Sequence, residues 1–251
     1  MQFLEGQTVL VTGATGAIGQ AICASLVADG ARVIIHYGRN EAAAQALLDR
    51  LGGQGFCLAT DLSDPLAPTR LWDRAEAQAG RITALVNNAG VRSEVSVDAP
   101  LADWHATWSR EIQVNLLAAV DLTRAAIRHF RTQGGGRILN MASRAGQRGY
   151  SANAMAYGAT KAALINLTKS VAQSHGPEGI TALALAPGWV RTEMAEAFIA
   201  QHGEAAALAG IPVGRMAEPA EIGDLVAFCL RPSQVSLNGA VLDVNGGSYL
   251  R

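Results

Sequence analysis

A tyrosine and a lysine lie four residues apart, at Tyr157 and Lys161, in a stretch with helical spacing over roughly 157–174. Residues i and i+4 share one face of a helix, so the phenol and the ammonium are expected to be neighbours. A free phenol has a pKa near ~10, and lowering it toward neutrality by up to ~3 units takes roughly 4 kcal/mol of electrostatic help. A lysine one turn away in a water-poor cleft could supply that help. The pair could transfer protons, although the same spacing is common in ordinary amphipathic helices.

A glycine-rich turn is the second feature that could do chemistry. Gly13, Gly16 and Gly19 follow the apolar run "VLV" in the segment "TGATGAIG". Glycines let backbone N–H groups approach an anion, and the positive end of a helix starting near Ala17 adds attraction, so a pyrophosphate would suit the turn. The spacing departs from G-x-G-x-x-G, and the segment is not a P-loop because no Gly-Lys-Ser/Thr follows. From the turn alone, a dinucleotide site and a turn that serves only packing both stay open.

The end of the next expected strand bears on which dinucleotide could bind. The segment "HYGRN" has no acidic residue to hold a ribose 2′-hydroxyl, as enzymes that use NAD commonly do. Arg39 could instead make bidentate contacts with a 2′-phosphate, which favours NADP, or it could be a solvated arginine in a turn. Asp61, after the third expected strand, could accept a hydrogen bond from an adenine amino group, or it could cap a helix.

These residues follow short β-branched runs that alternate with Ala-rich helical stretches. Nearly continuous apolar strands that alternate with helices predict a parallel sheet covered on both faces. With right-handed crossovers, this gives a single Rossmann-like α/β domain over 1–251, a doubly wound parallel sheet of about seven strands. We expect strands at 7–13, 31–37, 55–62, 82–90, 136–143, 180–188 and 240–247, and helices at 17–29, 41–51, 70–79, 104–130 and 157–174.

Composition excludes several classes of partner. The net charge is −1, from 20 basic and 21 acidic residues, which gives no argument for nucleic acid or an anionic membrane. No signal peptide is evident, and no apolar run approaches the roughly 20 residues of a membrane helix. Cys23, Cys57 and Cys229 are too far apart for a metal site and are interpreted as buried thiols. We expect a soluble, cytoplasmic protein that holds no metal.

Seven short motifs then occur in one order along the chain. They are "TGATGAIG", "NNAG" (87–90), "VN" (114–115), "NMAS" (140–143), "YGATK" (157–161), "PGWVRT" (187–192) and "VNGG" (244–247). With these motifs the chain resembles, over essentially its whole length, the small single-domain branch of the short-chain dehydrogenase/reductase family. Three details depart from that pattern. The glycine spacing also fits the epimerase-like branch, Gly16 stands where NADP-preferring relatives often have a basic residue, and the interval from Ser143 to Tyr157 is long enough to predict a bulged loop.

The resemblance implies an oxidoreductase that interconverts a ketone and a secondary alcohol, similar to 3-oxoacyl-[acyl-carrier-protein] reductases. The implied cofactor is NADP(H), with NAD(H) possible. The implied catalytic residues are Asn115, Ser143, Tyr157 and Lys161. Tyr157 would transfer the proton, Ser143 would bind the substrate oxygen, Lys161 would hold the ribose hydroxyls, and Asn115 would hold a water that links Lys161 to solvent. The expected cofactor-binding residues are Gly13, Thr15, Gly16, Ala17, Ile18, Gly19, Tyr37, Arg39, Asn40, Asp61, Leu62, Asn88, Ala89, Gly90, Tyr157, Lys161, Pro187, Gly188, Val190 and Thr192.

The resemblance implies that the substrate is a small carbonyl compound or alcohol, and the residues expected around it are Ser143, Arg144, Tyr150 and Trp189. We expect Arg144 and Arg92 to face solvent rather than an anionic substrate. The segment over roughly 193–211 is expected to be a mobile lid. The resemblance implies a homotetramer through the two long helices. Three alternatives stay open: an NAD-dependent alcohol, sugar or xenobiotic dehydrogenase, a non-catalytic dinucleotide-binding sensor, and a nucleotide-sugar epimerase or dehydratase.

Overall fold

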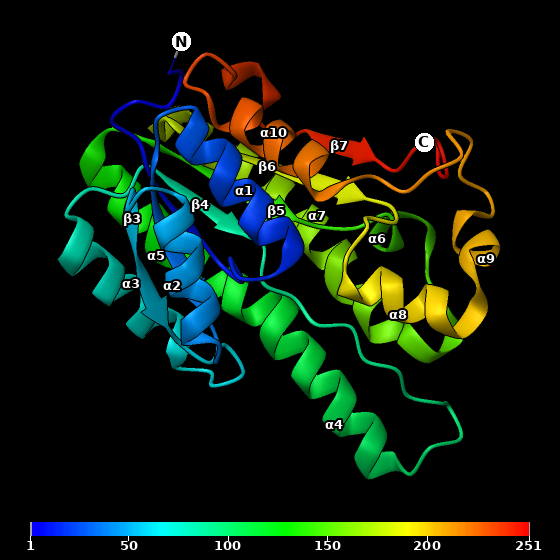
Figure 1. Ribbon diagram of the computed structural model, residues 1–251. Helices are drawn as coiled ribbons and strands as arrows, with labels where there is room; N and C mark the ends of the chain where they lie inside the picture. The colour runs from blue at the N-terminus through cyan, green and yellow to red at the C-terminus, as the bar shows by residue number, and fades with distance from the viewer. Residues whose placement is uncertain (1, 251) are drawn as a thin grey trace.

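Residues 2–250 are described in a computed structural model, and they form one parallel sheet with helices on both faces (Figure 1). The seven strands lie in the order β3-β2-β1-β4-β5-β6-β7. This is the doubly wound α/β architecture that the sequence predicts, with each predicted strand present in a shorter form. The strands are β1 (Thr8–Val11), β2 (Arg32–Tyr37), β3 (Gly55–Ala59), β4 (Ala84–Asn87), β5 (Gly136–Met141), β6 (Ile180–Pro187) and β7 (Val241–Val244).

The helices include every one that the sequence predicts. A π-helical turn, η1 (Gln113–Leu117), joins α4 to α5, so one helical run covers 101–133 where a helix over 104–130 is expected. Short 3₁₀ turns occur at 152–154, 176–178 and 235–237. The helices are α1 (Ala17–Ala28), α2 (Glu41–Arg50), α3 (Ala67–Ala79), α4 (Leu101–Ile112), α5 (Ala118–Gln133), α6 (Ala145–Arg148), α7 (Met155–His175), α8 (Glu193–His202), α9 (Glu204–Leu208) and α10 (Pro219–Leu230).

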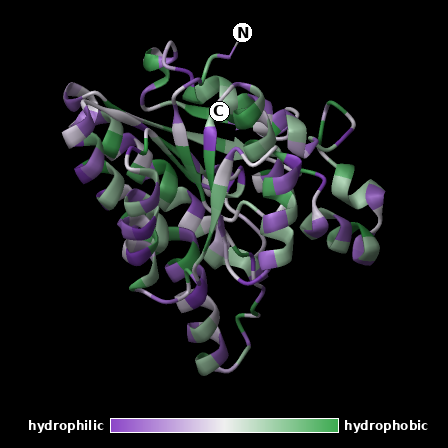
Figure 2. Ribbon diagram, turned by 60° about the vertical axis from the view of Figure 1, so that its left-hand side comes forward, coloured by the Kyte–Doolittle hydropathy of each residue, from purple (hydrophilic) through white to green (hydrophobic). Residues whose placement is uncertain are grey.

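Two hydrophobic cores lie on opposite faces of the sheet. Successive side chains of a strand point to opposite faces, so Val9 and Val11 enter the core beneath α1, α2 and α10, and Leu10 enters the core beneath α3, α5 and α7. Figure 2 shows the result, with mostly hydrophobic strands in the interior and hydrophilic residues along the outer helices. Burial on both faces explains why the strand sequences are almost continuously apolar.

The helix α10 is absent from the sequence-based assignment. It begins at Pro219, just after Glu218, and the side chains of Glu218 and Glu221 form a capping box. Its apolar residues, Ile222 and Val226 among them, pack against the same core as α1. The capping box and the proline at the first helical position were signals that could have predicted it.

The cysteines are free thiols, as expected, and Cys23 and Cys229 are buried. Cys57 is only half-buried, which differs from the prediction because it lies on β3, at the edge of the sheet. Among the described helices, none combines the length and apolarity needed to span a membrane. Within residues 2–250, no cluster of His, Cys, Asp and Glu has the composition to hold a metal ion.

The order of the strands reverses beside β1, which pairs with β2 on one side and with β4 on the other. The two chain connections diverge there, one toward α1 and one toward the long helical run that begins with α4 (Figure 1). A crevice outside the carboxyl ends of the strands is expected at such a reversal, and it is the usual ligand site of an open α/β sheet. The predicted functional motifs follow these strand ends.

Candidate active site

The crevice is present as a cavity of about 760 Å³ lined by the ends of β1 to β6. The wall brings together almost all of the residues expected to bind the cofactor. Ala17 lies outside the lining, and Tyr37 is buried in the core beneath α1 and α2. Those that line the cavity are Gly13, Thr15, Gly16, Ile18, Gly19, Arg39, Asn40, Asp61, Leu62, Asn88, Ala89, Gly90, Tyr157, Lys161, Pro187, Gly188, Val190 and Thr192.

Hydrogen bonds hold the glycine turn in shape from two sides. The side-chain amide of Asn88 donates to the carbonyl oxygens of Thr12 (2.8 Å) and Gly13 (3.1 Å). Gly13 has a φ of 60°, in the left-handed region that favours glycine. A Cβ on Gly19 would lie 2.4 Å from the Gly13 carbonyl oxygen, so the start of α1 packs directly against the turn. No side chain caps α1 at Gly16, so the N-terminal N–H groups of that helix face the cavity available to an anion.

His36 supports the same turn, and the sequence analysis missed it. The backbone N–H of Gly13 donates to His36 Nδ1 (3.1 Å), and His36 Nε2 lies 3.0 Å from the carbonyl oxygen of Thr60. Nδ1 must therefore be the acceptor and Nε2 the donor, which defines a neutral tautomer. Burial lowers the pKa of His36 to about 4. A histidine inside the otherwise apolar strand "RVIIHY" was the signal that could have found it.

At the far end of the cavity, Arg39 and Asp61 lie side by side. Arg39 Nη2 is 3.5 Å from Asp61 Oδ2, and the Arg39 side chain is 90% exposed. Asp61 also accepts hydrogen bonds from the hydroxyl (2.7 Å) and the backbone N–H (3.0 Å) of Ser63, which lower the pKa of its carboxyl group. Asn40 caps α2 by accepting from the Ala43 N–H (2.9 Å). The Arg39 side chain is therefore almost fully exposed where the end of β2 meets the cavity, and Asp61 is its ion-pair partner.

Ser143, Tyr157 and Lys161 converge at the other end. The Ser143 hydroxyl lies close enough to the Tyr157 phenol to lower its pKa, and the Lys161 Nζ lies 5.6 Å from the Tyr157 ring centroid. Lys161 is buried, and its ammonium donates to the Met141 carbonyl oxygen at 2.7 Å. Ser143 follows β5, and the other two residues occupy one face of α7, so the sheet and one helix set their spacing.

The pKa of Tyr157 differs from the expectation. Burial raises it to about 12, and the hydrogen bond from Ser143 only partly opposes that change. The spacing of Tyr157 and Lys161 predicts a lowered value, but the lysine is desolvated too, and burial lowers its pKa to about 8. At neutral pH this site therefore holds a protonated phenol beside an ammonium.

Asn115 is the buried centre of a small network in η1. Its side-chain oxygen accepts from the Val91 N–H (2.7 Å), and its amide donates to the Val91 carbonyl oxygen (2.9 Å) and to Glu111 Oε2 (2.6 Å). These bonds tie the loop after β4 to the helical run. The side chain is thus engaged by protein groups, although the resemblance implies that Asn115 holds a water. A π turn at this position is typical of a functional site.

Two of the predicted substrate residues lie elsewhere than expected. Arg144 is only 8% exposed, so the expectation that it faces solvent is wrong; its guanidinium donates to the Ser248 hydroxyl instead. The Arg92 side chain is also largely covered, at 17% exposure, and lies over the Tyr150 ring. Neither Arg144 nor Tyr150 lines the cavity, but the Tyr150 ring lies 5.7 Å from that of Tyr157. Trp189 lines the cavity as predicted.

The expected lid segment forms two short helices, α8 and α9. The Trp189 ring packs on Phe198 at 4.9 Å, which connects α8 to the cavity wall. Arg191 reaches Glu196 (3.2 Å) and Glu204 (2.8 Å), one on each helix. Thr192 caps α8 by accepting from the Ala195 N–H.

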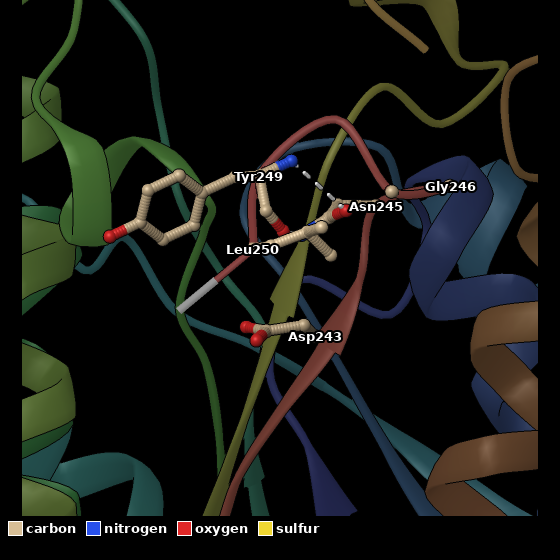
Figure 3. Close-up of a pocket in the computed structure, with 6 residues that line it drawn as sticks. Asp243, Asn245, Gly246, Tyr249 and Leu250 are labelled. Atoms are coloured by element: carbon tan, nitrogen blue, oxygen red, sulfur yellow. Dashed lines mark hydrogen bonds between the residues drawn. The ribbon is translucent and has the colours of Figure 1, made fainter. Parts of the chain in front are cut away.

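A second, smaller hollow of about 460 Å³ lies beside the C-terminal segment and is separate from the main cavity. Figure 3 shows its wall, where the backbone N–H of Tyr249 donates to the Asn245 side chain while the Tyr249 ring points away. The backbone around Gly246 and Gly247 turns with positive φ. Ser248, which accepts the hydrogen bond from Arg144, belongs to the same turn.

The fold and the site together define a class of protein. A glycine turn at the reversal of a parallel sheet, with a tyrosine and a lysine lining the same cavity, is the arrangement of an NAD(P)-dependent oxidoreductase acting on CH–OH or carbonyl groups. The chain matches the family model described as short chain dehydrogenase over residues 7–203. It therefore belongs to the short-chain dehydrogenase family, as its motifs predict.

Its relatives agree in length as well as in sequence. The 3-oxoacyl-[acyl-carrier-protein] reductase FabG of Vibrio cholerae is 35% identical over 247 residues, which cover 98% of this chain and 99% of that protein. The oxidoreductase UcpA of Escherichia coli is 34% identical over 260 residues, with 98% and 96% covered. Among solved structures, a short chain dehydrogenase from Burkholderia cenocepacia in complex with NADP has a TM-score of 0.88 and 33% identity, and 98% of each chain is covered.

Several further residues that line the cavity were not predicted. Most of them sit beside predicted residues at the same strand ends, whereas Arg110, Val114 and Glu193 lie on helical segments that reach the cavity. These residues are His36, Gly38, Thr60, Ser63, Arg110, Val114, Met141, Ala142 and Glu193.

Proposed function

We propose that this protein is an NADP(H)-dependent reductase that converts a ketone, a 3-oxoacyl thioester in particular, into a secondary alcohol. The observation that carries the proposal is the convergence of Ser143, Tyr157 and Lys161 on the cavity that the glycine turn lines. The substrate class is supported by the FabG reductases, which are 35% identical over nearly the whole chain. The family membership already argues against the non-catalytic sensor.

The residues of the cavity fit a dinucleotide. Its two ends, Arg39 and Tyr157, lie on either side of the glycine turn, and the uncapped start of α1 suits a pyrophosphate between them. A Cβ on Gly90 would lie 3.4 Å from Lys161 Nζ, so a larger residue there would crowd the lysine that is proposed to hold the ribose. When bound, the nicotinamide supplies the hydride.

Tyr157 is proposed to deliver the proton to the substrate oxygen. Because burial keeps its pKa at about 12, the phenol is protonated at neutral pH, which is the form that reduction of a ketone needs. Ser143 donates a second hydrogen bond to the same oxygen and holds it in line. Lys161, charged and 5.6 Å from the ring centroid, stabilises the phenolate that is left after the transfer.

Preference for NADP(H) is proposed from Arg39. Its guanidinium is free to contact a 2′-phosphate, and Asp61, 3.5 Å away, helps to orient it. Asp61 follows β3 rather than β2, and its carboxylate is engaged by Arg39 and by the hydroxyl of Ser63. Gly16 adds no charge, so Arg39 would carry most of the discrimination.

The proposal extends to assembly and to the lid. We propose a cytoplasmic homotetramer whose contacts use the runs of α4, α5 and α7, where Leu101, Leu117 and Met155 are exposed apolar residues. Light scattering that gives a monomer mass would contradict it. Gating by α8 and α9 is proposed because Trp189 connects them to the cavity.

The experiment is a panel of carbonyl compounds offered to the purified protein with NADPH and, separately, with NADH. The panel holds an acetoacetyl thioester, a cyclic ketone, a diketone and a few sugars. We expect consumption of NADPH with the thioester, and slower consumption of NADH. Turnover of only a sugar or cyclic ketone would contradict the substrate class, and faster turnover with NADH would contradict the cofactor. Cofactor binding without turnover across the panel would overturn the catalytic proposal for these substrates.

A further inference from the structure

Glu111, on α4, is a carboxylic acid with no exposed surface that lies beside the active site. Moving a carboxylate out of water costs several kcal/mol unless other groups compensate for it. Nothing in the proposed reaction uses Glu111, and it is not among the residues that the motifs single out. Its partners therefore indicate what the buried charge does.

Both oxygens of Glu111 accept hydrogen bonds from N–H groups. The backbone N–H of Ser93 donates to Oε1, and the amide of Asn115 donates to Oε2 at 2.6 Å. One N–H donor on each oxygen stabilises the ionised form of the carboxylate. Burial raises the pKa of Glu111, while the two donors and the charge of Lys161 lower it. Burial is the largest of these effects and raises the pKa of Glu111 overall, so the two N–H donors are what stabilise its negative charge.

The same network leads to Lys161 on α7. Asn115 Oδ1 and Lys161 Nζ flank Gly90, because a Cβ built on that glycine would lie 3.4 Å from each. The Asn115 amide also lies 3.3 Å from the hydroxyl of Thr160, the neighbour of Lys161 in the chain. Asn115 thus touches Glu111 on one side and the surroundings of the lysine on the other.

Lys161 needs a counter-charge because it is almost fully buried, at 4% exposure. Its bond to the Met141 carbonyl oxygen satisfies one proton but supplies no negative charge. Desolvation lowers the pKa of Lys161, and the charge of Glu111 raises it. Two titratable groups of α7 interact with Glu111: Lys161, whose charge lowers the pKa of Glu111, and Tyr157, whose own pKa the Glu111 charge raises directly.

We propose that Glu111 is a positioning residue that holds Asn115 in place and supplies the counter-charge that keeps Lys161 an ammonium beside Tyr157. This inference rests on the proposed role of Lys161 in the reduction. It assigns to Glu111 an action on the lysine and no contact with substrate or cofactor. Without that charge, the lysine would lose its proton at a lower pH and Tyr157 would lose its electrostatic support.

The test reads the charge of Lys161 directly and does not depend on turnover. The chain contains two lysines, Lys161 and Lys169, so lysine labelled with ¹³C at Cε gives two NMR signals, and Lys169→Arg assigns them. In Glu111→Gln we expect the Lys161 titration midpoint to fall by about one pH unit, because the Glu111 charge raises the pKa of Lys161 and a nearby opposite charge shifts a pKa by roughly 1–3 units. Glu94→Gln, which removes a half-exposed carboxylate paired with Arg92, is the matched control and should leave the midpoint unchanged. An unchanged midpoint in Glu111→Gln would overturn the proposal.

A second readout is the free energy of unfolding, which applies if Glu111→Gln folds poorly. Under the proposal, Glu111→Gln costs stability because Lys161 is left without its counter-charge, so the cost should shrink in a Lys161→Met background. An equal cost in both backgrounds, or failure to fold in both, would contradict the coupling.

Activity gives a third readout if the protein reduces ketones. The alkaline limb of kcat in Glu111→Gln should move to lower pH by the same amount as the Lys161 midpoint. A uniform loss of kcat with an unshifted limb would assign Glu111 a merely structural role and overturn the proposal. Absence of reductase activity would refute the proposed function alone, since the NMR midpoint is measured without substrate.

Discussion

Acid is expected to destabilise this fold through His36. The ring accepts the Gly13 N–H at Nδ1 and contacts the Thr60 carbonyl oxygen at Nε2, so a second proton would place an N–H at Nδ1 against another N–H donor. Burial holds its pKa at about 4, well below the value of an exposed histidine. At pH values between the folded-state and unfolded-state pKa of His36, the residue binds a proton in the unfolded chain but not in the folded protein. Stability is therefore lost as the pH falls through this window.

The magnitude follows from linkage. An unfolded-state pKa of ~6.5 and a folded-state pKa of about 4 give a maximum loss of about 3 kcal/mol, reached below the lower value. By about pH 5 the expected loss from this residue alone is about 2 kcal/mol. His36→Asn removes the titration, and its side-chain oxygen can still accept the Gly13 N–H. The variant should therefore be less sensitive to acid than the wild type by that amount.

The assay is urea unfolding of both proteins at about pH 7.5 and about pH 5. His105→Asn, a change at an exposed histidine, is the matched control and should keep the wild-type pH dependence. If His36→Asn loses as much stability between the two pH values as the wild type, the buried neutral histidine is not what senses acid. The reasoning about the glycine turn would then be refuted.

Three further outcomes are expected. Arg39→Ala should raise the Kd for NADPH by about tenfold or more and leave that for NADH nearly unchanged, because only NADPH offers a 2′-phosphate; equal losses by calorimetry would refute the assignment. Gly19→Ala should destabilise the protein by about 3 kcal/mol in urea unfolding, since its Cβ would meet the Gly13 carbonyl oxygen at 2.4 Å, whereas in Gly16→Ala the same contact is 3.7 Å and should cost far less. Thr192→Val should remove the cap of α8 at a cost of about 1 kcal/mol, seen as faster amide exchange in α8 with unchanged exchange in α7.

The alternation of strands and helices predicted the sheet correctly. Each strand is buried on both faces, and its sequence is therefore almost continuously apolar. The helix α10 was missed although its capping box and its first-position proline are visible in the sequence. The motifs predicted Ser143, Tyr157 and Lys161, since the spacing along one helix and the end of one strand is fixed by backbone geometry. Arg144 was placed wrongly because its partner, Ser248, is 104 residues away in the sequence. His36 and Glu111 were missed for the same reason, since their hydrogen bonds to Gly13 and Ser93 form only in the folded chain.

The raised pKa of Tyr157 also could not be predicted from the sequence. The i, i+4 spacing with Lys161 is visible in the sequence, but the burial of both residues is not, and here burial outweighs the attraction between them. A protonated tyrosine favours the reductive direction at neutral pH. In the oxidative direction the same phenol would have to lose its proton first, so oxidation of the alcohol should accelerate with rising pH.

The most direct test of the proposed reaction compares Tyr157→Phe with the wild type on the best ketone of the panel. NADPH consumption is followed by absorbance, and NADPH binding is measured separately by calorimetry. We predict that kcat falls by roughly 10²–10⁴-fold, the usual contribution of a general acid, while the Kd for NADPH changes little. Retention of more than about a tenth of the activity would contradict the role of Tyr157 as the proton donor.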